Sequence, residues 1–257
     1  MTAIISQSGY MTFRDLRAFI RQPFYLFATL VQPIVWLLLF GKLFGSVMAH
    51  STGSGSYIGY LTPGVVAMTA LFASGWSGMV FVAEMKEGTL NRFLVTPVRR
   101  GALIVGRIIY QAITVVIQGV IILLIGLAAG ARFHGGIGVL LVFLICTAFI
   151  AMAFASLSNA LGLLTRSEES VIGIAQFLVL PLAFLSSTFV PRDLMPGWMN
   201  TIAGWNPINW LVEVGRESLH SDVDWNLVLT RGGGLLALTI VCAWLSTLAF
   251  RAYQRSV

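Results

Sequence analysis

The chain has 257 residues, of which 57% are hydrophobic and only 10% are charged, and its mean hydropathy is +0.87. Soluble domains carry about 25% charged residues, and a core of this length could not bury so much apolar surface. The composition therefore excludes a water-soluble protein and indicates one that crosses a membrane several times.

The first predicted element is an amphipathic helix over residues 12–22, "TFRDLRAFIRQ". Its apolar side chains Phe13, Leu16, Phe19 and Ile20 fall on one helical face, and three arginines fall on the other. We expect this helix to lie on the inner membrane surface and to anchor the chain there.

Apolar runs with few charges fill most of the remaining sequence. A helix that crosses a bilayer needs about 20 apolar residues, and charged residues occur only near the ends of two of these runs, at Lys42 and Arg107. We expect a single all-α membrane domain over residues 1–257 with six transmembrane helices. Their approximate bounds are 23–45, 58–83, 103–129, 138–164, 170–190 and 232–250.

The distribution of charge predicts the orientation. With the N-terminus in the cytoplasm, eleven of the sixteen Lys and Arg residues lie on the cytoplasmic side, whereas the ten carboxylates divide evenly between the two sides. The positive-inside rule favours this arrangement, with both termini cytoplasmic. The net charge of +6 then reflects contact with an anionic lipid bilayer, and we expect no nucleic-acid partner.

The second and third expected spans are joined on the cytoplasmic side by residues 84–100, "EMKEGTLNRFLVTPVRR", which hold six of the chain's 26 charged side chains. Gly88 permits a sharp turn, Thr89–Leu94 can form a short amphipathic helix, and Pro97 suits the first turn of the next helix. Such a rigid connection could transmit a movement from a cytoplasmic partner to the two membrane helices. An ordinary positively charged loop is the alternative, and the residues alone leave both open.

A second unusual segment, residues 191–231, precedes the last span on the outer side and contains four of the seven tryptophans. Tryptophan is enriched at membrane interfaces, and Asn206 followed by Pro207 is typical of a helix start. We expect two short helices that lie at or dip into the outer leaflet, with a plain extracellular loop as the alternative. The residues that we single out are Pro191, Pro196, Trp198, Asn206, Pro207, Trp210 and Glu213.

Several kinds of chemistry have no matching residues in the sequence. Ionisable residues at membrane depth mark proton relays and ion-coupled transport, so their absence from the middle of the spans argues against a self-powered transporter. The amides of Gln118, Asn159 and Gln176 lie within spans, where they either bond neighbouring helices or line a pathway. The three histidines have no metal-ligand spacing, and the chain has no catalytic or nucleotide-hydrolysis motif. We therefore expect no catalytic residue, metal or cofactor bound by this chain.

The cytoplasmic segment resembles the signature loop of ABC-2-type exporter permeases, notably the daunorubicin-resistance group. "VPRDLMPGW" and "NPINWLVEVGR" in the outer segment are similar to the same family, and Met85 departs from its pattern, where a third charged residue is common. The loop motif carries onto Glu84, Lys86, Glu87, Gly88, Thr89, Leu90, Arg92, Leu94, Thr96, Pro97 and Val98.

The resemblance implies a second permease subunit, which we expect to form a homodimer, and an outer re-entrant helix pair. It also implies a separate ATP-binding cassette ATPase in two copies, which binds the ATP and Mg²⁺ and receives residues 84–100 as a coupling helix. Charges of both signs suit such docking, and apolar side chains provide anchors. The implied interface consists of Glu84, Lys86, Glu87, Gly88, Thr89, Leu90, Arg92, Phe93, Leu94, Pro97, Arg99 and Arg100.

The expected function is that of the membrane subunit of an ATP-driven exporter, which moves a hydrophobic or amphipathic drug outward by alternating access. Export of a lipid-linked glycan or another envelope component is the main alternative. A channel or secondary transporter that works without an ATPase, and an integral-membrane enzyme, are the alternatives from other classes of protein.

Overall fold

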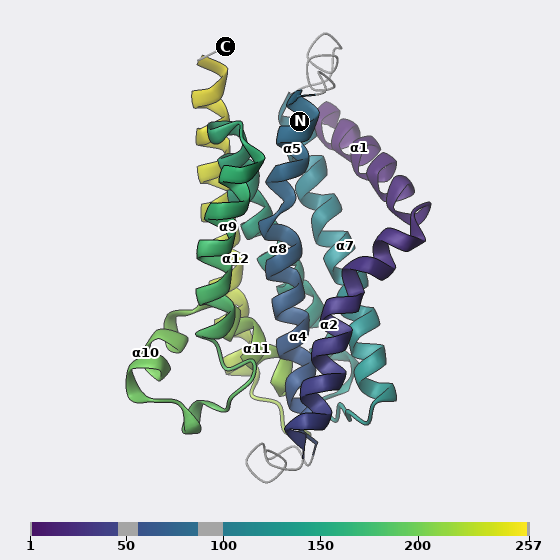
Figure 1. Cartoon of the computed structure of the whole chain (residues 1–257), viewed down its shortest axis with the longest axis vertical. Coiled ribbons are helices and arrows are strands. Elements are labelled where there is room, and N and C mark those ends of the chain that lie inside the picture. Colours follow the sequence, from purple (N-terminus) through teal and green to yellow (C-terminus); the bar gives the residue numbers. More distant parts are fainter. Residues whose placement is uncertain (1, 46–55, 87–99, 256–257) are drawn as a thin grey trace.

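The computed structural model describes residues 2–45, 56–86 and 100–255, and every regular element within these ranges is a helix (Figure 1). The helices are α1 (Thr2–Ile20), α2 (Pro23–Leu43), α4 (Tyr57–Gly75), α5 (Ser77–Lys86), α7 (Arg100–Ala128), α8 (Gly136–Thr165), α9 (Glu168–Phe184), the short 3₁₀ helix η1 (Arg192–Leu194), α10 (Gly197–Trp205), α11 (Pro207–Glu217) and α12 (Trp225–Arg255).

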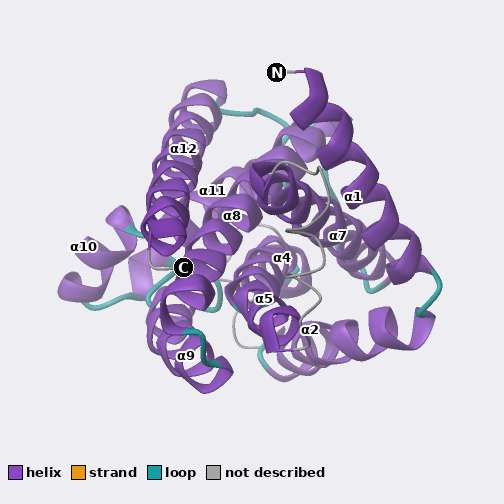
Figure 2. Cartoon of the chain, turned by 90° about the horizontal axis from the view of Figure 1, so that it is seen from above, coloured by secondary structure: helices purple, strands orange, loops and turns teal. Residues whose placement is uncertain are grey.

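The core of the bundle forms around α4 and α8. Seen along the bundle, α4, α5 and α8 lie in the middle, and α1, α2, α7, α9 and α12 surround them (Figure 2). Helix α8 contacts α4, α5, α7, α9, α11 and α12, and Phe143, Ile150 and Leu163 of this helix are fully buried. A helix that is apolar on all sides is expected at such a central position.

The helices at the periphery of the bundle carry large apolar side chains that point away from it. Leu39 of α2 and Ile240 and Trp244 of α12 are each more than half exposed. An apolar surface of this extent is typical of a protein whose surroundings are lipid. Five helical stretches in the described residues are long and apolar enough to cross a membrane, within α2, α4 with α5, α7, α8 and α12.

The fifth expected span, residues 170–190, corresponds to α9, which has 17 residues and ends at Phe184. The apolar run continues beyond this point, but three hydroxyl residues interrupt the helix. The hydroxyl group of Ser186 donates to the carbonyl oxygen of Ala183 at 2.7 Å and lies 2.8 Å from the hydroxyl of Thr188. Such local bonds compete with continuation of the helix.

The N-terminal helix is longer than the expected 12–22. Helix α1 begins at Thr2 and packs along α7. The hydroxyl group of Thr12 donates to the carbonyl oxygens of Ser8 (2.9 Å) and Gly106 (3.0 Å), and a Cβ added at Gly106 would lie 3.0 Å from Cβ of Met11. The added length therefore belongs to a helix–helix contact, which the charge pattern of residues 12–22 does not reveal.

The long helices run up and down the bundle, and different segments of the chain lie at its two ends (Figure 1). The N- and C-termini lie at one end, together with the C-terminal end of α5 and the N-terminal end of α9, whereas α10 and α11 lie at the other (Figure 1). Helix α11 begins at Pro207, and the side chain of Asn206 caps it by accepting a bond from the backbone N–H of Ile208 at 2.9 Å, which is where the sequence places this helix start.

Candidate functional site

Most of the sequence-predicted coupling segment lies outside the described residues. Of its predicted interface, Glu87, Gly88, Thr89, Leu90, Arg92, Phe93, Leu94, Pro97 and Arg99 fall in the range 87–99, so the short helix predicted there stays a prediction. The structure describes the flanks: Glu84 and Lys86 belong to the last turn of α5, and α7 begins at Arg100.

At this flank, α5 is linked to the start of α9 by an ion pair that sequence reasoning did not identify. Nζ of Lys86 lies 2.9 Å from Oε1 of Glu168. The hydrogen bond to this carboxylate raises the pKa of Lys86, and a hydrogen bond from Ser167 lowers the pKa of Glu169. Both side chains of the pair are substantially exposed, so the pair contributes little to stability. It shows, however, that the C-terminal end of α5 lies next to the N-terminal end of α9.

The second membrane span is interrupted where the sequence predicted one continuous helix over 58–83. Helix α4 ends at Gly75, Trp76 has a non-helical backbone, and α5 begins at Ser77. The break leaves backbone groups of the span without their usual partners. A broken helix is tolerated at membrane depth only where a neighbour bonds the freed groups.

Ser158 of α8 provides those bonds. Its hydroxyl group accepts from the backbone N–H of Gly78 at 2.9 Å and donates to the carbonyl oxygen of Gly75 at 2.5 Å. The contact requires glycine, because a Cβ added at Gly78 would lie 2.1 Å from the carbonyl oxygen of Ser158, and one added at Gly162 would lie 2.7 Å from that of Gly78. The two helices are therefore in backbone contact, as small residues permit in lipid.

A second polar contact supports the same break. The hydroxyl of Ser77 donates to Oδ1 of Asn159 at 3.2 Å and lies 3.4 Å from the carbonyl oxygen of Ala155. Both freed ends of the span are thus held by one turn of α8. The break is therefore a joint between α4 and the short helix α5, and bonds from α8 stabilise it. Helix α5 ends at Lys86.

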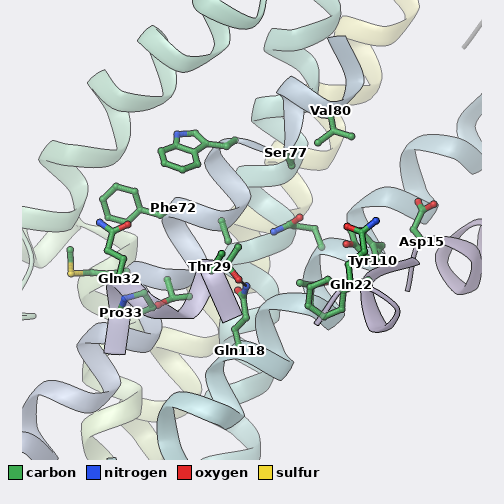
Figure 3. Close-up of a pocket in the computed structure, with 18 of the residues that line it drawn as sticks. Asp15, Gln22, Thr29, Gln32, Pro33, Phe72, Ser77, Val80, Tyr110 and Gln118 are labelled. Carbon is green, nitrogen blue, oxygen red and sulfur yellow. Dashed lines mark hydrogen bonds between the residues drawn. The ribbon is translucent and has the colours of Figure 1, made fainter. Parts of the chain in front are cut away.

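Beside this joint, the bundle contains a partly open cavity of about 680 Å³ that residues of α1, α2, α4, α5, α7 and α8 line. In Figure 3, Thr29 and Gln118 lie next to each other in the lining, with Gln32 and Phe72 to one side and Tyr110 and Gln22 to the other. Its aromatic lining consists of Phe19, Trp36, Phe72, Trp76 and Tyr110, and its amide lining of Gln22, Gln32, Gln111, Gln118 and Asn159.

The structure brings two of the three predicted pathway amides together at this cavity. Gln118 of α7 donates through Nε2 to the hydroxyl of Thr29 at 3.1 Å, which joins α7 to α2. Asn159 of α8 also lines the cavity, and its Oδ1 accepts a hydrogen bond from Ser77. Gln176 is only half-buried on α9 and does not line this cavity.

The outer segment is organised by the carboxylate of Glu213, one of the residues singled out from the sequence. Its Oε1 accepts from Nη1 of Arg192 at 2.9 Å and from Nδ2 of Asn209 at 2.7 Å, and its Oε2 lies 2.8 Å from Nε of Arg231. Arg192 belongs to η1 and Arg231 to α12. One carboxylate in α11 therefore ties together three elements that lie far apart in the sequence.

A second arginine of this region is more enclosed. Nη1 of Arg216 donates to the hydroxyl of Ser187 at 2.8 Å, Nη2 donates to the carbonyl oxygen of Ser187, and the guanidinium lies 3.6 Å from the ring centre of Tyr60. Burial lowers the pKa of Arg216 to about 10, so the group stays cationic at neutral pH. The contact fixes α11 to α4, and Tyr60 also donates to the carbonyl oxygen of Ser187 at 3.1 Å.

The other singled-out residues of the segment shape its helices. Pro191 precedes η1, and Pro196 precedes α10. Trp210 donates through Nε1 to the carbonyl oxygen of Gly204 at 2.8 Å and packs against Gly234 of α12, whereas Trp198 is 63% exposed. The segment thus combines an anchored half, α11, with a half, α10, that presents tryptophans outward.

Comparison with known proteins agrees with these features. The family described as ABC-2 type transporter matches residues 6–220, from α1 through α11. The chain belongs to the ABC-2 type transporter family. This ABC-2 chain is 29% identical over 232 residues, 88% of its length, to the daunorubicin resistance ABC transporter permease protein DrrB1 of Streptomyces coeruleorubidus, of which the match covers 80%.

Other relatives of this ABC-2 permease carry different names. It is 28% identical over 226 residues to nodulation protein J of Rhizobium leguminosarum bv. trifolii, with 86% of this chain and 84% of the relative covered. It is 28% identical over 208 residues to the putative transport permease ycf38 of Porphyra purpurea, with 80% and 71% covered. The ABC-2 assignment, together with the apolar helices, identifies the chain as a multi-pass membrane permease.

Proposed function

We propose that this chain is the membrane subunit of an ATP-driven exporter that works with a separate ATP-binding cassette ATPase in two copies and with a second permease subunit, most simply a second copy of itself. The observation that carries the proposal is the ABC-2 family match over residues 6–220. The absence of ionisable residues from the middle of the spans supports it, because transport then needs an external source of energy.

In the proposed mechanism, residues 84–100 dock on the ATPase on the cytoplasmic side, where both termini also lie. Closure of the ATPase dimer moves this segment, and α5 passes the movement to the joint at Trp76. Helix α9 forms the fifth of the six spans, and α10 and α11 form a re-entrant pair at the outer leaflet. A cavity that faces the cytoplasm is thereby converted into one that releases its contents outward.

We further propose that the cargo is a hydrophobic or amphipathic drug-like compound that leaves across a bacterial inner membrane. The support is the similarity to permeases named for daunorubicin and doxorubicin resistance and the apolar and amide lining of the cavity. Export of a lipid-linked glycan or another envelope component is the alternative, because relatives such as nodulation protein J are not named for drug resistance.

The test is transport in inverted membrane vesicles that contain the full chain together with its partner ATP-binding cassette ATPase. We expect daunorubicin to accumulate in the vesicles on addition of ATP and Mg²⁺, and not with a non-hydrolysable ATP analogue or without the ATPase. Accumulation that persists without the ATPase would favour a secondary transporter or channel. ATP-dependent movement of a lipid-linked glycan without movement of daunorubicin would favour the envelope alternative.

A further inference from the structure

The partly open cavity beside Trp76 has the size of a ligand site within a single subunit. Its volume of about 680 Å³ lies in the range of pockets that enclose drug-sized molecules, about 300–1,000 Å³. Five aromatic side chains from α1, α2, α4, α7 and the joint itself contribute to its wall. Such a lining favours a molecule with a planar, apolar body.

The same wall contains polar atoms that no other described group satisfies. Among the described residues, three buried side-chain atoms without a hydrogen-bond partner belong to residues that line this cavity. They are Oγ1 of Thr114, Oε1 of Gln118 and Nδ2 of Asn159, and each of these residues is at least 95% buried. Leaving a polar group unpaired in a buried position costs about 1–3 kcal/mol, so three such groups among the residues of one cavity point to a bound partner.

The chemistry of these three atoms specifies what that partner offers. The amide oxygen needs a donor, the amide nitrogen needs an acceptor, and the hydroxyl can serve as either. The lining contains one charged side chain of each sign, Asp15 and Arg107, so its formal charges sum to zero. The lining therefore offers no net charge to an ionised ligand.

We propose that this intrasubunit cavity binds a neutral aromatic amphiphile that carries both hydrogen-bond donors and acceptors. The inference extends the proposed export function to a site in each subunit, and it is tested by binding alone, without the ATPase. Trp76 and Ser77, the first residues after α4, belong to the wall, so a molecule in the cavity contacts the joint that leads into residues 84–100.

The test uses purified full-length chain in lipid nanodiscs and the neutral aglycone of daunorubicin as the probe, since it is planar, fluorescent and hydroxylated. Energy transfer from tryptophan to the probe is measured against empty nanodiscs to subtract partition into lipid. We expect saturable binding of about one probe per chain. We also expect daunorubicin, which adds a cationic amine, to bind less tightly.

Two substitutions separate binding in the cavity from effects on folding. Thr114→Val removes an unpaired hydroxyl and breaks no bond of the protein, so we expect unchanged or higher thermal stability and about three- to tenfold weaker binding, in line with one lost hydrogen bond. Ala73→Phe places a ring in the cavity and should abolish saturable binding. The control is Leu124→Met on the exposed side of α7, which should bind the probe as the unaltered chain does.

Several results would overturn the inference. Binding that never saturates shows that the probe only enters lipid, and saturable binding that neither Thr114→Val nor Ala73→Phe affects places the site elsewhere. If the cavity holds only water or lipid, neither substitution changes probe binding. Failure of the proposed function gives a different result, because the probe would then bind to the cavity while vesicles show no ATP-dependent transport.

Discussion

At the scale of single residues, Ser158 shows how one small polar side chain can stabilise an interrupted membrane helix. Its hydroxyl bonds to the N–H of Gly78 and to the carbonyl oxygen of Gly75 on the two sides of Trp76. Backbone groups at this depth have no water to replace such bonds. The residue is therefore more important for the second span than for its own helix.

We predict that Ser158→Ala destabilises the protein by about 1–3 kcal/mol, because it leaves buried backbone groups of the second span unpaired. The measurement is thermal or denaturant unfolding of the purified chain in detergent. The matched control is Ser156→Ala, two residues away, whose hydroxyl bonds only to the carbonyl oxygen of Met152 in its own helix. Equal stability of the two variants would contradict the assigned role of Ser158.

Glu213 has a comparable role in the outer segment, where it joins Arg192, Asn209 and Arg231. We predict that Glu213→Gln lowers stability by about 1–3 kcal/mol, since it leaves two partly buried arginines without their counter-charge. The exposed Asp222 provides the control, and Asp222→Asn should change stability by less than about 0.5 kcal/mol. The measurement is the thermal midpoint of both variants. Equal midpoints would show that Glu213 does not stabilise the segment.

At the scale of helices, the contact between α5 and α8 depends on the absence of side chains. Gly78 and Gly162 each face the backbone of the other helix, and an added methyl group would fall 2.1 Å and 2.7 Å from carbonyl oxygens. A displacement of this size cannot be absorbed by a rotamer change. The two helices would have to separate.

We therefore predict that Gly78→Ala destabilises the chain by about 2 kcal/mol or more, although alanine is the better helix former. The control is Gly173→Ala in α9, where a Cβ would meet no atom within 4 Å, and this change should be neutral or stabilising. Unfolding measurements on both variants test the prediction, and a stabilised Gly78→Ala would show that the helices are not in contact.

The helices that the sequence predicted well are those whose limits are set by solvation alone. Long apolar runs must be helical in lipid, which is why α7 and α8 occupy the expected runs. Helix α12 covers the expected run 232–250 but begins earlier, at Trp225. Limits set by neighbours were missed. Helix α1 starts early because it packs on α7, and α9 stops at Phe184 because the hydroxyl groups that follow bond locally.

The candidate site was partly predictable for the same reason. Gln118 and Asn159 stand out as amides in apolar runs, and both line the cavity. Thr114 did not stand out, because threonine is unremarkable within a membrane helix. The break at Trp76 and its partner Ser158 were also missed, since the pairing joins positions about 80 residues apart and "GWSG" by itself fits a continuous helix.

At the scale of the whole molecule, the proposed coupling predicts that substitutions in residues 84–100 can abolish transport without affecting folding. We expect Gly88→Pro, and the double change Glu84→Lys with Glu87→Lys, to abolish ATP-dependent transport while membrane insertion and detergent-solubilised yield stay unchanged. The measurement is daunorubicin accumulation in inverted vesicles that contain the ATPase. His220→Gln, an exposed position at the opposite end of the bundle, is the control, and normal transport by the first two variants would refute the coupling role.

The position of the interruption at Trp76 divides the second span into arms of unequal length. The longer arm, α4, is held to the outer region by Tyr57 and Tyr60, which donate to the carbonyl oxygens of Phe189 and Ser187. The shorter arm, α5, has ten residues and thus a length of about 15 Å. For a helix of that length, a rotation of about 10° at Trp76 would move the C-terminal end of α5 by roughly 2.6 Å while α4 stays in place.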